Sequence, residues 1–421
     1  MNAFFKAYCR VYQAAFRVAM KVMNFRQPQI IDGLDNLMTA IKDENVNSLL
    51  IVTDNWINNI GKLTDNLKAK LTENGISYVV YDGVIPNPDV TNIEDAFKLY
   101  NENGCQAIIA FGGGSHMDCA KGVACRVAHP NKTIAQMAGT LKVRKKLVPF
   151  FAIPTTSGTG SEATVAAIIS NRAEHTKYPV QDPCLIPKYA VLDPFNTATV
   201  PAHLTAWQGM DALTHAVEAY IGKSNTDLTR DLSVRATKLI FENLVAVYND
   251  AVKYSADGPL TIDKVKDDKA YIKRRKNMQW ASYYAGVAFT RAYVGYAHSL
   301  AHAIGGMYPK TQHGLANAVL LPYVLDYYGS AAYTPLAELA NAIGITGPSD
   351  ESKAKQFIKA IRDLNERMNI PTQLPVEGYD ESTIPEMVEH SFKEANPLYP
   401  VPKFMDKETM TEIYKKVLIA K

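Results

Sequence analysis

The chain has 421 residues, of which 47% are hydrophobic, 21% charged and 10% aromatic, and this balance excludes a disordered, collagen-like or low-complexity protein. Its net charge is only +3, and no cluster of basic and aromatic residues indicates a nucleic acid partner. The five cysteines include no CxxC pair, which is typical of a reducing compartment, so we expect a cytoplasmic protein. No run of about 18 uninterrupted apolar residues predicts a membrane span.

Residues 3–23 are the first predicted element, an amphipathic helix that forms an extension of its own over residues 1–23. Its basic residues fall within one narrow arc of a helical wheel, and its apolar residues fill the opposite side. The basic residues are Lys6, Arg10, Arg17 and Lys21. Such a helix packs on its own protein or across a dimer, or it docks on a partner enzyme, a filament, a microcompartment shell or an anionic membrane surface. The sequence leaves these alternatives open.

Short apolar runs alternate with helical stretches in the segment that follows. The runs are SLLIVTD, SYVVYDG, AIIAF and PFFAIP. Because strands that are apolar throughout are buried on both faces, these runs predict a parallel sheet with helices on either side. Strand-like runs stop after Leu192–Pro194, and long helical patterns follow. We therefore expect an α/β domain over residues 24–200 and an all-α domain over residues 201–421.

Two loops of small residues follow neighbouring predicted strands. Gly112, Gly113, Gly114 and Ser115 come directly after AIIAF and precede a helical run. Glycines at such a turn let backbone N–H groups approach a phosphate, and the helix N-terminus adds a favourable dipole. The second loop, PTTSGTGSE at residues 154–162, supplies hydroxyls and two further glycines. Either loop alone is compatible with an ordinary turn, but the pair favours a nucleotide crevice.

Asp54 ends the first strong strand, SLLIVTD. A carboxylate at this place accepts hydrogen bonds from the adenosine ribose and repels a 2′-phosphate, which favours NAD over NADP. The alternative is an ordinary helix N-cap before Trp56.

Three segments of the predicted helical domain carry candidate metal ligands. Asp211 and His215 are spaced i, i+4, and His298 and His302 repeat that spacing, so each pair shares one helix face. His313 follows in a QHGLANA segment. One carboxylate and three imidazoles suit iron, zinc, nickel or cobalt, although a single such pair is more often a salt bridge. The other histidines are interpreted as structural or exposed: His116, His129, His175, His203 and His390.

Five motifs stand in one order along the chain: GGGS before a helix, PTTSGTGSE, GMDALTHAVEAY, GYAHSLAHAIGG and HGLANAVLLP. From about Asn24 to near the C-terminus the chain resembles the iron-containing (group III) alcohol dehydrogenase family. The resemblance implies an α/β dinucleotide-binding domain followed by a helical metal-binding domain, in the architecture also found in dehydroquinate synthase. It also implies a homodimer or a higher homo-oligomer.

The resemblance assigns roles to individual residues. Asp211, His215, His298 and His313 resemble the metal ligands, and His302 resembles a non-ligand histidine near the substrate. The cofactor residues that it implies are Asp54, Gly112, Gly113, Gly114, Ser115, Thr155, Thr156, Thr159 and Lys177, the last near the cofactor ribose.

The expected activity is hydride transfer between NAD(H) and a small primary alcohol or aldehyde, with Fe(2+) or Zn(2+) in the metal site. The expected direction is aldehyde reduction in anaerobic metabolism. His302 is the candidate catalytic residue, relaying the proton between substrate oxygen and solvent. The alternatives are a zinc polyol dehydrogenase or a lyase on the same scaffold, or an enzyme recruited to an assembly or a bacterial microcompartment by residues 3–23.

Overall fold

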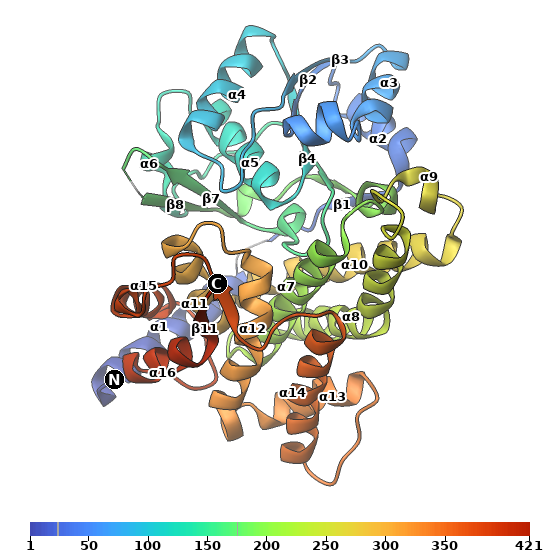
Figure 1. Cartoon of the computed structure of the whole chain (residues 1–421). Helices are drawn as coiled ribbons and strands as arrows, with labels where there is room; N and C mark the ends of the chain where they lie inside the picture. The colour runs from blue at the N-terminus through green and yellow to red at the C-terminus, as the bar shows by residue number, and fades with distance from the viewer. Residues whose placement is uncertain (23–24, 175) are drawn as a thin grey trace. The chain divides into compact units, whose positions relative to one another are not determined.

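The computed structural model describes residues 1–22, 25–174 and 176–421, and the chain forms two compact units. One unit is Asn24–Ala198, and the other combines Met1–Met23 with Thr199–Lys421 (Figure 1). By its contacts, the N-terminal segment therefore belongs to the second unit.

The first unit is built on a six-stranded sheet in which every pair of neighbours is parallel. Its strands, in spatial order, are β1 (Gln29–Ile31), β9 (Tyr189–Val191), β6 (Phe150–Pro154), β4 (Ala107–Gly112), β2 (Ser48–Val52) and β3 (Ser77–Tyr81). The four predicted apolar runs are β2, β3, β4 and β6, which confirms the parallel α/β sheet.

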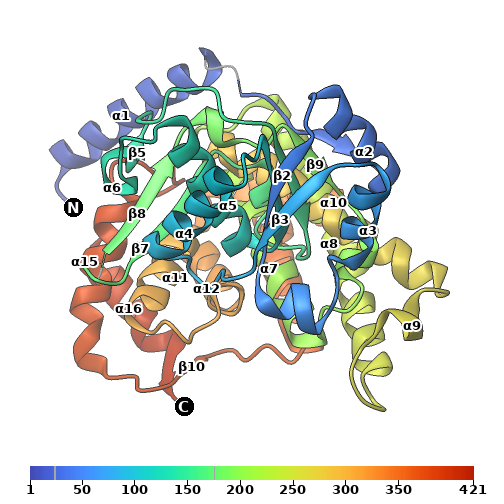
Figure 2. The ribbon, with the colours of Figure 1, turned by 90° about the horizontal axis from the view of Figure 1, so that it is seen from above.

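Helices cover both faces of this sheet. One face packs against α4 (Val90–Glu102) and α5 (Gly114–Ala128), and the other against α2 (Gly33–Asp43) and α3 (Asp65–Glu73) (Figure 2). Successive strand residues point to opposite faces, so Leu50 and Val52 enter the first core while Leu49 and Ile51 enter the second. The strands are apolar throughout because both faces are buried.

A smaller, mixed sheet of three strands, which the sequence did not predict, belongs to the same unit. Its order is β5 (Gly139–Thr140), β8 (Thr176–Gln181) and β7 (Ala166–Asn171), with β7 and β8 antiparallel. β8 reads TKYPVQ, which lacks the apolar run that marks the central strands, and half of its residues are exposed. The helix α6 (Ile134–Met137) completes this part, and one-turn helices lie at Trp56–Ile60, Ser161–Ala163, Pro183–Leu185 and Pro194–Thr197.

The second unit is helical and is centred on α7 (Ala202–Ile221). Every residue of α7 from Gly209 to Ile221 is buried, because α8, α10 and α12 pack around it. Its further helices are α8 (Asp227–Tyr254), α9 (Ile262–Val265), α10 (Lys269–Ala292), α11 (Tyr296–Met307), α12 (His313–Tyr328), α13 (Tyr333–Ala342), α14 (Asp350–Arg367), α15 (Ile384–Ala395) and α16 (Lys407–Val417), with single turns at Gly329–Ala331 and Glu381–Thr383. One short parallel pair, β10 (Leu374–Val376) and β11 (Leu418–Ala420), is added to the predicted helices.

The predicted N-terminal helix is α1 (Ala3–Val22). Polar contacts hold it to its own unit: Gln13 Nε2 donates to Pro397 O and Tyr399 O, and the Arg10 guanidinium lies 4.0 Å above the Phe404 ring. Much of its apolar side points outward instead, with these side chains exposed: Phe4, Tyr8, Val11, Tyr12 and Val18. Among the described residues, no helix combines the length and apolarity that crossing a membrane requires.

Candidate metal centre and cofactor loops

The glycine turn lies where β4 ends and α5 begins. β4 ends at Gly112, Gly113 is the N-cap, and α5 starts at Gly114, so the free N–H groups of the first helical turn are available to an anion. Gly112 has a φ of +154°, and a Cβ there would lie 2.2 Å from Cγ of His116. Only glycine fits this position.

The PTTSGTGSE loop packs against the glycine turn, because β4 and β6 are neighbours in the sheet. The backbone N–H of Thr155 donates to Gly112 O at 3.0 Å. A Cβ on Gly113 would lie 2.9 Å from Thr156 Cγ2, and one on Gly114 would lie 3.0 Å from the corresponding methyl carbon of Thr159. The structure thus brings together the glycines and threonines that the sequence assigned to one cofactor site.

Asp54 makes two kinds of contact with its carboxylate. Oδ1 accepts from the backbone N–H of Ile57 at 2.8 Å, as a helix cap does, and Oδ2 lies 2.8 Å from His116 Nε2. His116 Nδ1 accepts from Gly113 N–H at 3.0 Å, so the ring proton sits on Nε2 and is donated to Asp54. Burial raises the pKa of Asp54, but the hydrogen bonds from His116 and the backbone outweigh it and lower the pKa below 3.8.

His116 therefore links the strand-end carboxylate to the glycine turn, a role that the sequence did not reveal. The sequence signal that could have indicated this role is the position of His116, three residues after the N-cap Gly113. A side chain at that position can reach back to the N-cap N–H group. Of the remaining predicted residues, Ser115 Oγ accepts from Asn87 N–H at 3.3 Å. Lys177 is exposed on β8, opposite Ser170, and its place beside a ribose stays a prediction. His175 lies outside the described residues.

A buried lysine fixes the far end of the PTTSGTGSE loop. The Lys121 ammonium donates to three backbone carbonyls, of Ser161, Thr164 and Ala166, and to the hydroxyls of Ser161 and Thr164. Burial lowers its pKa to about 8. The charge is tolerated because all these oxygens face it.

Three of the four predicted metal ligands converge in the helical unit: Asp211 from α7, His298 from α11 and His313 from α12. Asp211 Oδ1 lies 3.8 Å from His298 Nε2 and 3.4 Å from His313 Nε2, and one ligand atom from each residue lies within 4.8 Å of the others. A tetrahedral ion with bonds of about 2.1 Å separates its ligand atoms by about 3.4 Å. The spacing fits a divalent metal.

His215, the fourth predicted ligand, lies beside this group of three. Its ring stacks on His298 with centroids 4.3 Å apart, and its Nδ1 is 3.9 Å from Asp211 Oδ2. Phe289 covers the ring at a centroid distance of 4.1 Å. The structure thus places His215 next to the converging atoms, and its role as a ligand stays a prediction.

The protonation state of His298 suits a metal ligand. Nδ1 lies 2.6 Å from Glu218 Oε2, while Nε2 is buried and has no hydrogen-bond partner among the residues that the structure describes. Burial and the neighbouring histidines hold the pKa of His298 well below 6.5, so the ring is neutral. A neutral ring that donates through Nδ1 directs the Nε2 lone pair at the site, and an unpartnered buried nitrogen is what a metal would satisfy.

Asn317 is a further residue at this site that the sequence analysis missed. It is fully buried, and its side-chain amide nitrogen lies 2.8 Å from Asp211 Oδ1 and 3.0 Å from His313 Nε2. It stands four residues after His313 on α12, so helical spacing is the signal that could have identified it.

His302 lies at the exposed side of the histidine cluster. Its ring stacks on His313 with centroids 5.1 Å apart, and its Nδ1 lies 2.6 Å from Glu394 Oε1. The same oxygen accepts from the hydroxyl of Tyr399 at 2.5 Å. Although desolvation raises the pKa of Glu394, the contacts with His302 and Tyr399 lower it below 4.5, so Glu394 is an anionic partner.

Comparison with known proteins places this geometry in a family. The family model described as iron-containing alcohol dehydrogenase matches residues 30–194, and that of the C-terminal part of the Fe-containing alcohol dehydrogenase family matches residues 205–262 and 259–418. The chain belongs to the iron-containing alcohol dehydrogenase family. It is therefore a metal-dependent alcohol/aldehyde oxidoreductase of a family that uses iron and NAD, as the ordered motifs predicted.

Individual members of this family resemble the chain over most of its length. The 1,3-propanediol dehydrogenase of Citrobacter freundii is 36% identical over 370 residues, covering 87% of this chain and 90% of that protein. The crystal structure of a 1,3-propanediol oxidoreductase superimposes with a TM-score of 0.83 at 32% identity, over 93% of this chain and 98% of the other. A sulfoacetaldehyde reductase from Bifidobacterium kashiwanohense, solved with NAD+, gives a TM-score of 0.78 at 26% identity, over 93% and 97% of the chains.

Proposed function

We propose that this protein transfers hydride between NAD(H) and a small primary alcohol or aldehyde, with Asp211, His215, His298 and His313 holding one divalent metal ion. Residues 24–200 would form the dinucleotide-binding domain, residues 201–421 the metal-binding domain, and residues 1–23 a helical extension. The observation that carries the proposal is the buried, unpartnered Nε2 of His298 beside Asp211 and His313.

The proposed cofactor site is the pair of loops at the ends of β4 and β6. Backbone N–H groups at the start of α5 would bind the pyrophosphate, and Thr155, Thr156 and Thr159 would line the other side. Asp54, an ionised carboxylate held by His116, would accept from the ribose hydroxyls and exclude a 2′-phosphate, which selects NAD. Lys177 is assigned to the ribose on the family resemblance.

The metal, when bound, supplies a Lewis acid that polarises the carbonyl oxygen of an aldehyde and stabilises the alkoxide form of an alcohol. The chain's own residues fix where that oxygen sits and move its proton. We assign the proton transfer to His302, because it stands beside His313, is exposed, and is oriented by Glu394. His302→Ala should abolish turnover while the metal content stays that of the parent protein; unchanged turnover at every pH would remove His302 from the mechanism.

Iron(II) is the proposed metal, and aldehyde reduction in anaerobic metabolism the proposed direction. Membership of the iron-containing family supports iron. A sulfoacetaldehyde reductase is among the similar proteins, as are two enzymes of 1,3-propanediol, and the reductase supports the proposed direction. Imidazole and carboxylate ligands also bind zinc, more tightly than iron in the usual affinity order. Metal analysis after anaerobic purification separates the two, since zinc in place of iron would favour a zinc polyol dehydrogenase or a lyase on this scaffold.

Anaerobic assay of NADH oxidation tests the activity directly. Short aldehydes, aldehydes derived from diols, and ketones form the panel, and the proposal expects the short aldehydes to be reduced fastest. NADH oxidation with none of them, by protein that contains one metal ion per chain, would contradict the proposed activity.

The outward side of α1 supports a proposal on assembly. We propose that the protein is a cytoplasmic homodimer or higher homo-oligomer and that a second copy covers Phe4, Tyr8 and Val11, since aromatic and aliphatic side chains of this kind are enriched in interface cores. Arg10 and Gln13 hydrogen-bond the helix to the backbone carbonyls of Val401 and Tyr399.

Tyr8→Glu combined with Val11→Glu alters this side of α1 and spares its polar tethers. Sedimentation should show the variant as a smaller species than the parent protein. An unchanged assembly state, together with loss of co-sedimentation with a partner enzyme or a microcompartment shell in a cell extract, would instead make α1 an address helix.

A further inference from the structure

Glu218 is a buried carboxylate of α7 that lies within the GMDALTHAVEAY motif but has no role in the predicted ligand set. Its residue is 2% exposed. Three donors converge on it: the backbone N–H groups of Gly295 and Ala297, each at 2.8 Å, and Nδ1 of His298 at 2.6 Å. Two of these donors are backbone groups at the start of α11, the helix that carries His298. Glu218 therefore contacts both a metal ligand and the helix that positions it.

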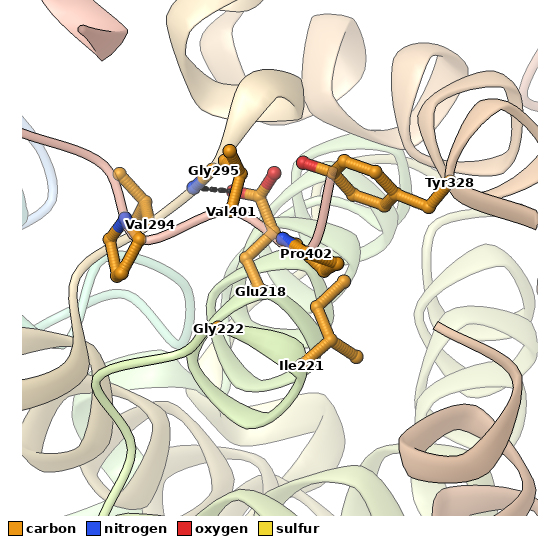
Figure 3. A pocket seen from close by; sticks show the side chains of 9 residues that line it. Glu218, Ile221, Gly222, Val294, Gly295, Tyr328, Val401 and Pro402 are labelled. Atoms are coloured by element: carbon orange, nitrogen blue, oxygen red, sulfur yellow. Dashed lines mark hydrogen bonds between the residues drawn. The ribbon is translucent and has the colours of Figure 1, made fainter. Parts of the chain in front are cut away.

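The surroundings of Glu218 are dry. The narrow cavity beside it has no room for a water molecule and is lined by Val294, Tyr328 and Pro402 among others, and the hydroxyl of Tyr328 points toward the carboxylate (Figure 3). A Cβ on Gly295 would lie 2.7 Å from Glu218 Oε1, so glycine is what allows this close approach. The carboxylate accepts its hydrogen bonds from protein donors, and because no water fits beside it, these donors rely on the carboxylate as their acceptor.

Helical geometry places Glu218 on the ligand-bearing side of α7. Asp211, His215 and Glu218 are spaced i, i+4, i+7, so one face of the buried part of α7 carries all three. A carboxylate at the N-terminus of α11 also complements the dipole of that helix. Because Nδ1 of His298 donates to Glu218, the lone pair of Nε2 is left for the side on which Asp211 and His313 lie.

We propose that Glu218 is the positioning residue of the metal centre: it selects the Nδ1–H tautomer of His298 and anchors the first turn of α11, so that His298 Nε2 is presented to the metal. This inference rests on the metal site of the proposed function and adds a residue outside the predicted ligand set. Carboxylates that hold ligating histidines in this way change metal affinity about 10–100-fold when they are removed.

Glu218→Gln is the deciding variant. The glutamine offers one oxygen to three donors, and its amide N–H groups face N–H groups. Affinity for Co(II) is measured on the full-length, metal-depleted protein by competition with a chelator, and the visible spectrum of bound Co(II) reports the ligand geometry. We expect the dissociation constant to rise 10–100-fold and the Co(II) spectrum to change, while Glu218→Asp, which keeps the charge, gives an intermediate value and stands in if the glutamine variant does not fold.

Two further variants separate positioning from general stability. Glu162→Gln is the matched control, because Glu162 is a glutamate buried as deeply as Glu218, yet it lies in the α/β unit. Its Co(II) affinity should equal that of the parent protein. In a His298→Ala background, Glu218→Gln should weaken Co(II) binding no further, because its effect acts through that ring.

The outcomes are distinguishable. Equal Co(II) affinity of the parent protein and Glu218→Gln, or an undiminished effect in the His298→Ala background, would overturn the role of Glu218 and leave the proposed function standing. A parent protein that binds no Co(II) or Zn(II) at one ion per chain would overturn the metal site itself.

Discussion

Replacing Gly112 by alanine perturbs the cofactor site through one methyl group. The new Cβ would lie 2.2 Å from Cγ and 2.3 Å from Nδ1 of His116, so the ring has to move. That ring holds both Asp54 and the N–H of Gly113. The substitution therefore strains the backbone and disconnects the Asp54 carboxylate from the glycine turn.

The expected cost has two parts. A φ of +154° is a conformation that residues with a side chain rarely adopt, and forcing alanine into it costs about 2 kcal/mol. The hydrogen bond from His116 to the ionised Asp54 contributes about 2 kcal/mol. We expect Gly112→Ala to lower the free energy of unfolding of the α/β unit by about 4 kcal/mol. The dissociation constant of NADH should rise at least tenfold, which is about 1.4 kcal/mol.

Gly75→Ala is the matched control for this prediction. Gly75 has a φ of +70°, and a Cβ there would meet no atom within 4 Å, so only strain of about 1 kcal/mol applies. Urea unfolding measures the free energy of unfolding, and fluorescence titration measures the dissociation constant of NADH. In a His116→Ala background, Gly112→Ala should cost only the strain of about 2 kcal/mol. Equal free energies of unfolding and equal NADH affinities of Gly112→Ala and Gly75→Ala would show that the contact with His116 contributes nothing.

Four further predictions follow from the sites. Asp211→Ala should leave less than one tenth of the parent metal content after anaerobic purification, because it removes the carboxylate that both His298 Nε2 and His313 Nε2 face. A metal content equal to that of the parent protein, measured by elemental analysis, would contradict the ligand assignment. Asp54→Asn should raise kcat/KM for NADPH relative to NADH at least tenfold, since a neutral amide no longer repels a 2′-phosphate; an unchanged ratio would leave Asp54 as a helix cap. The pKa of Asp54 is lowered in the folded protein, so the stabilisation by its ionised form is complete above the unfolded pKa and is lost as the pH falls through the folded pKa. The parent protein should therefore be more stable than Asp54→Asn by about 1–3 kcal/mol at every pH from 5 to 8. This difference in unfolding free energy should shrink below about pH 4. Lys121→Met should destabilise the α/β unit by about 3 kcal/mol and weaken NADH binding, because the oxygens around the ammonium lose their hydrogen-bond donor. Unaltered urea unfolding would show that these oxygens find other donors.

Local patterns in the sequence were enough to predict four of the six strands of the parallel sheet and three candidate metal ligands that lie close together. The apolar runs of β2, β3, β4 and β6 mark strands buried on both faces, and this signal needs no long-range information. Likewise, helical spacing and the order of the motifs pointed to Asp211, His298 and His313, which the structure brings together.

Contacts between distant segments were not predictable in this way. His116 binds a carboxylate 62 positions earlier, and Glu218 binds a ring 80 positions later, so neither partner lies within one helix or turn. β8 was not predicted because TKYPVQ contains no apolar run, and β7 was not predicted although AAII is apolar, because it pairs antiparallel with β8 outside the central sheet. The orientation of α1 is set by polar contacts of Arg10 and Gln13 with the segment around Tyr399, which a helical wheel does not contain.

The proposed function depends on one divalent ion held by a carboxylate and three imidazoles of the helical unit. X-ray absorption at the metal edge, on protein purified anaerobically and containing one ion per chain, tests it directly. We expect nitrogen and oxygen ligands at about 2.0–2.2 Å, with imidazole scattering that weakens when His298 or His313 is replaced by alanine. A spectrum with sulfur ligands, or imidazole scattering that is unchanged in both variants, would contradict it.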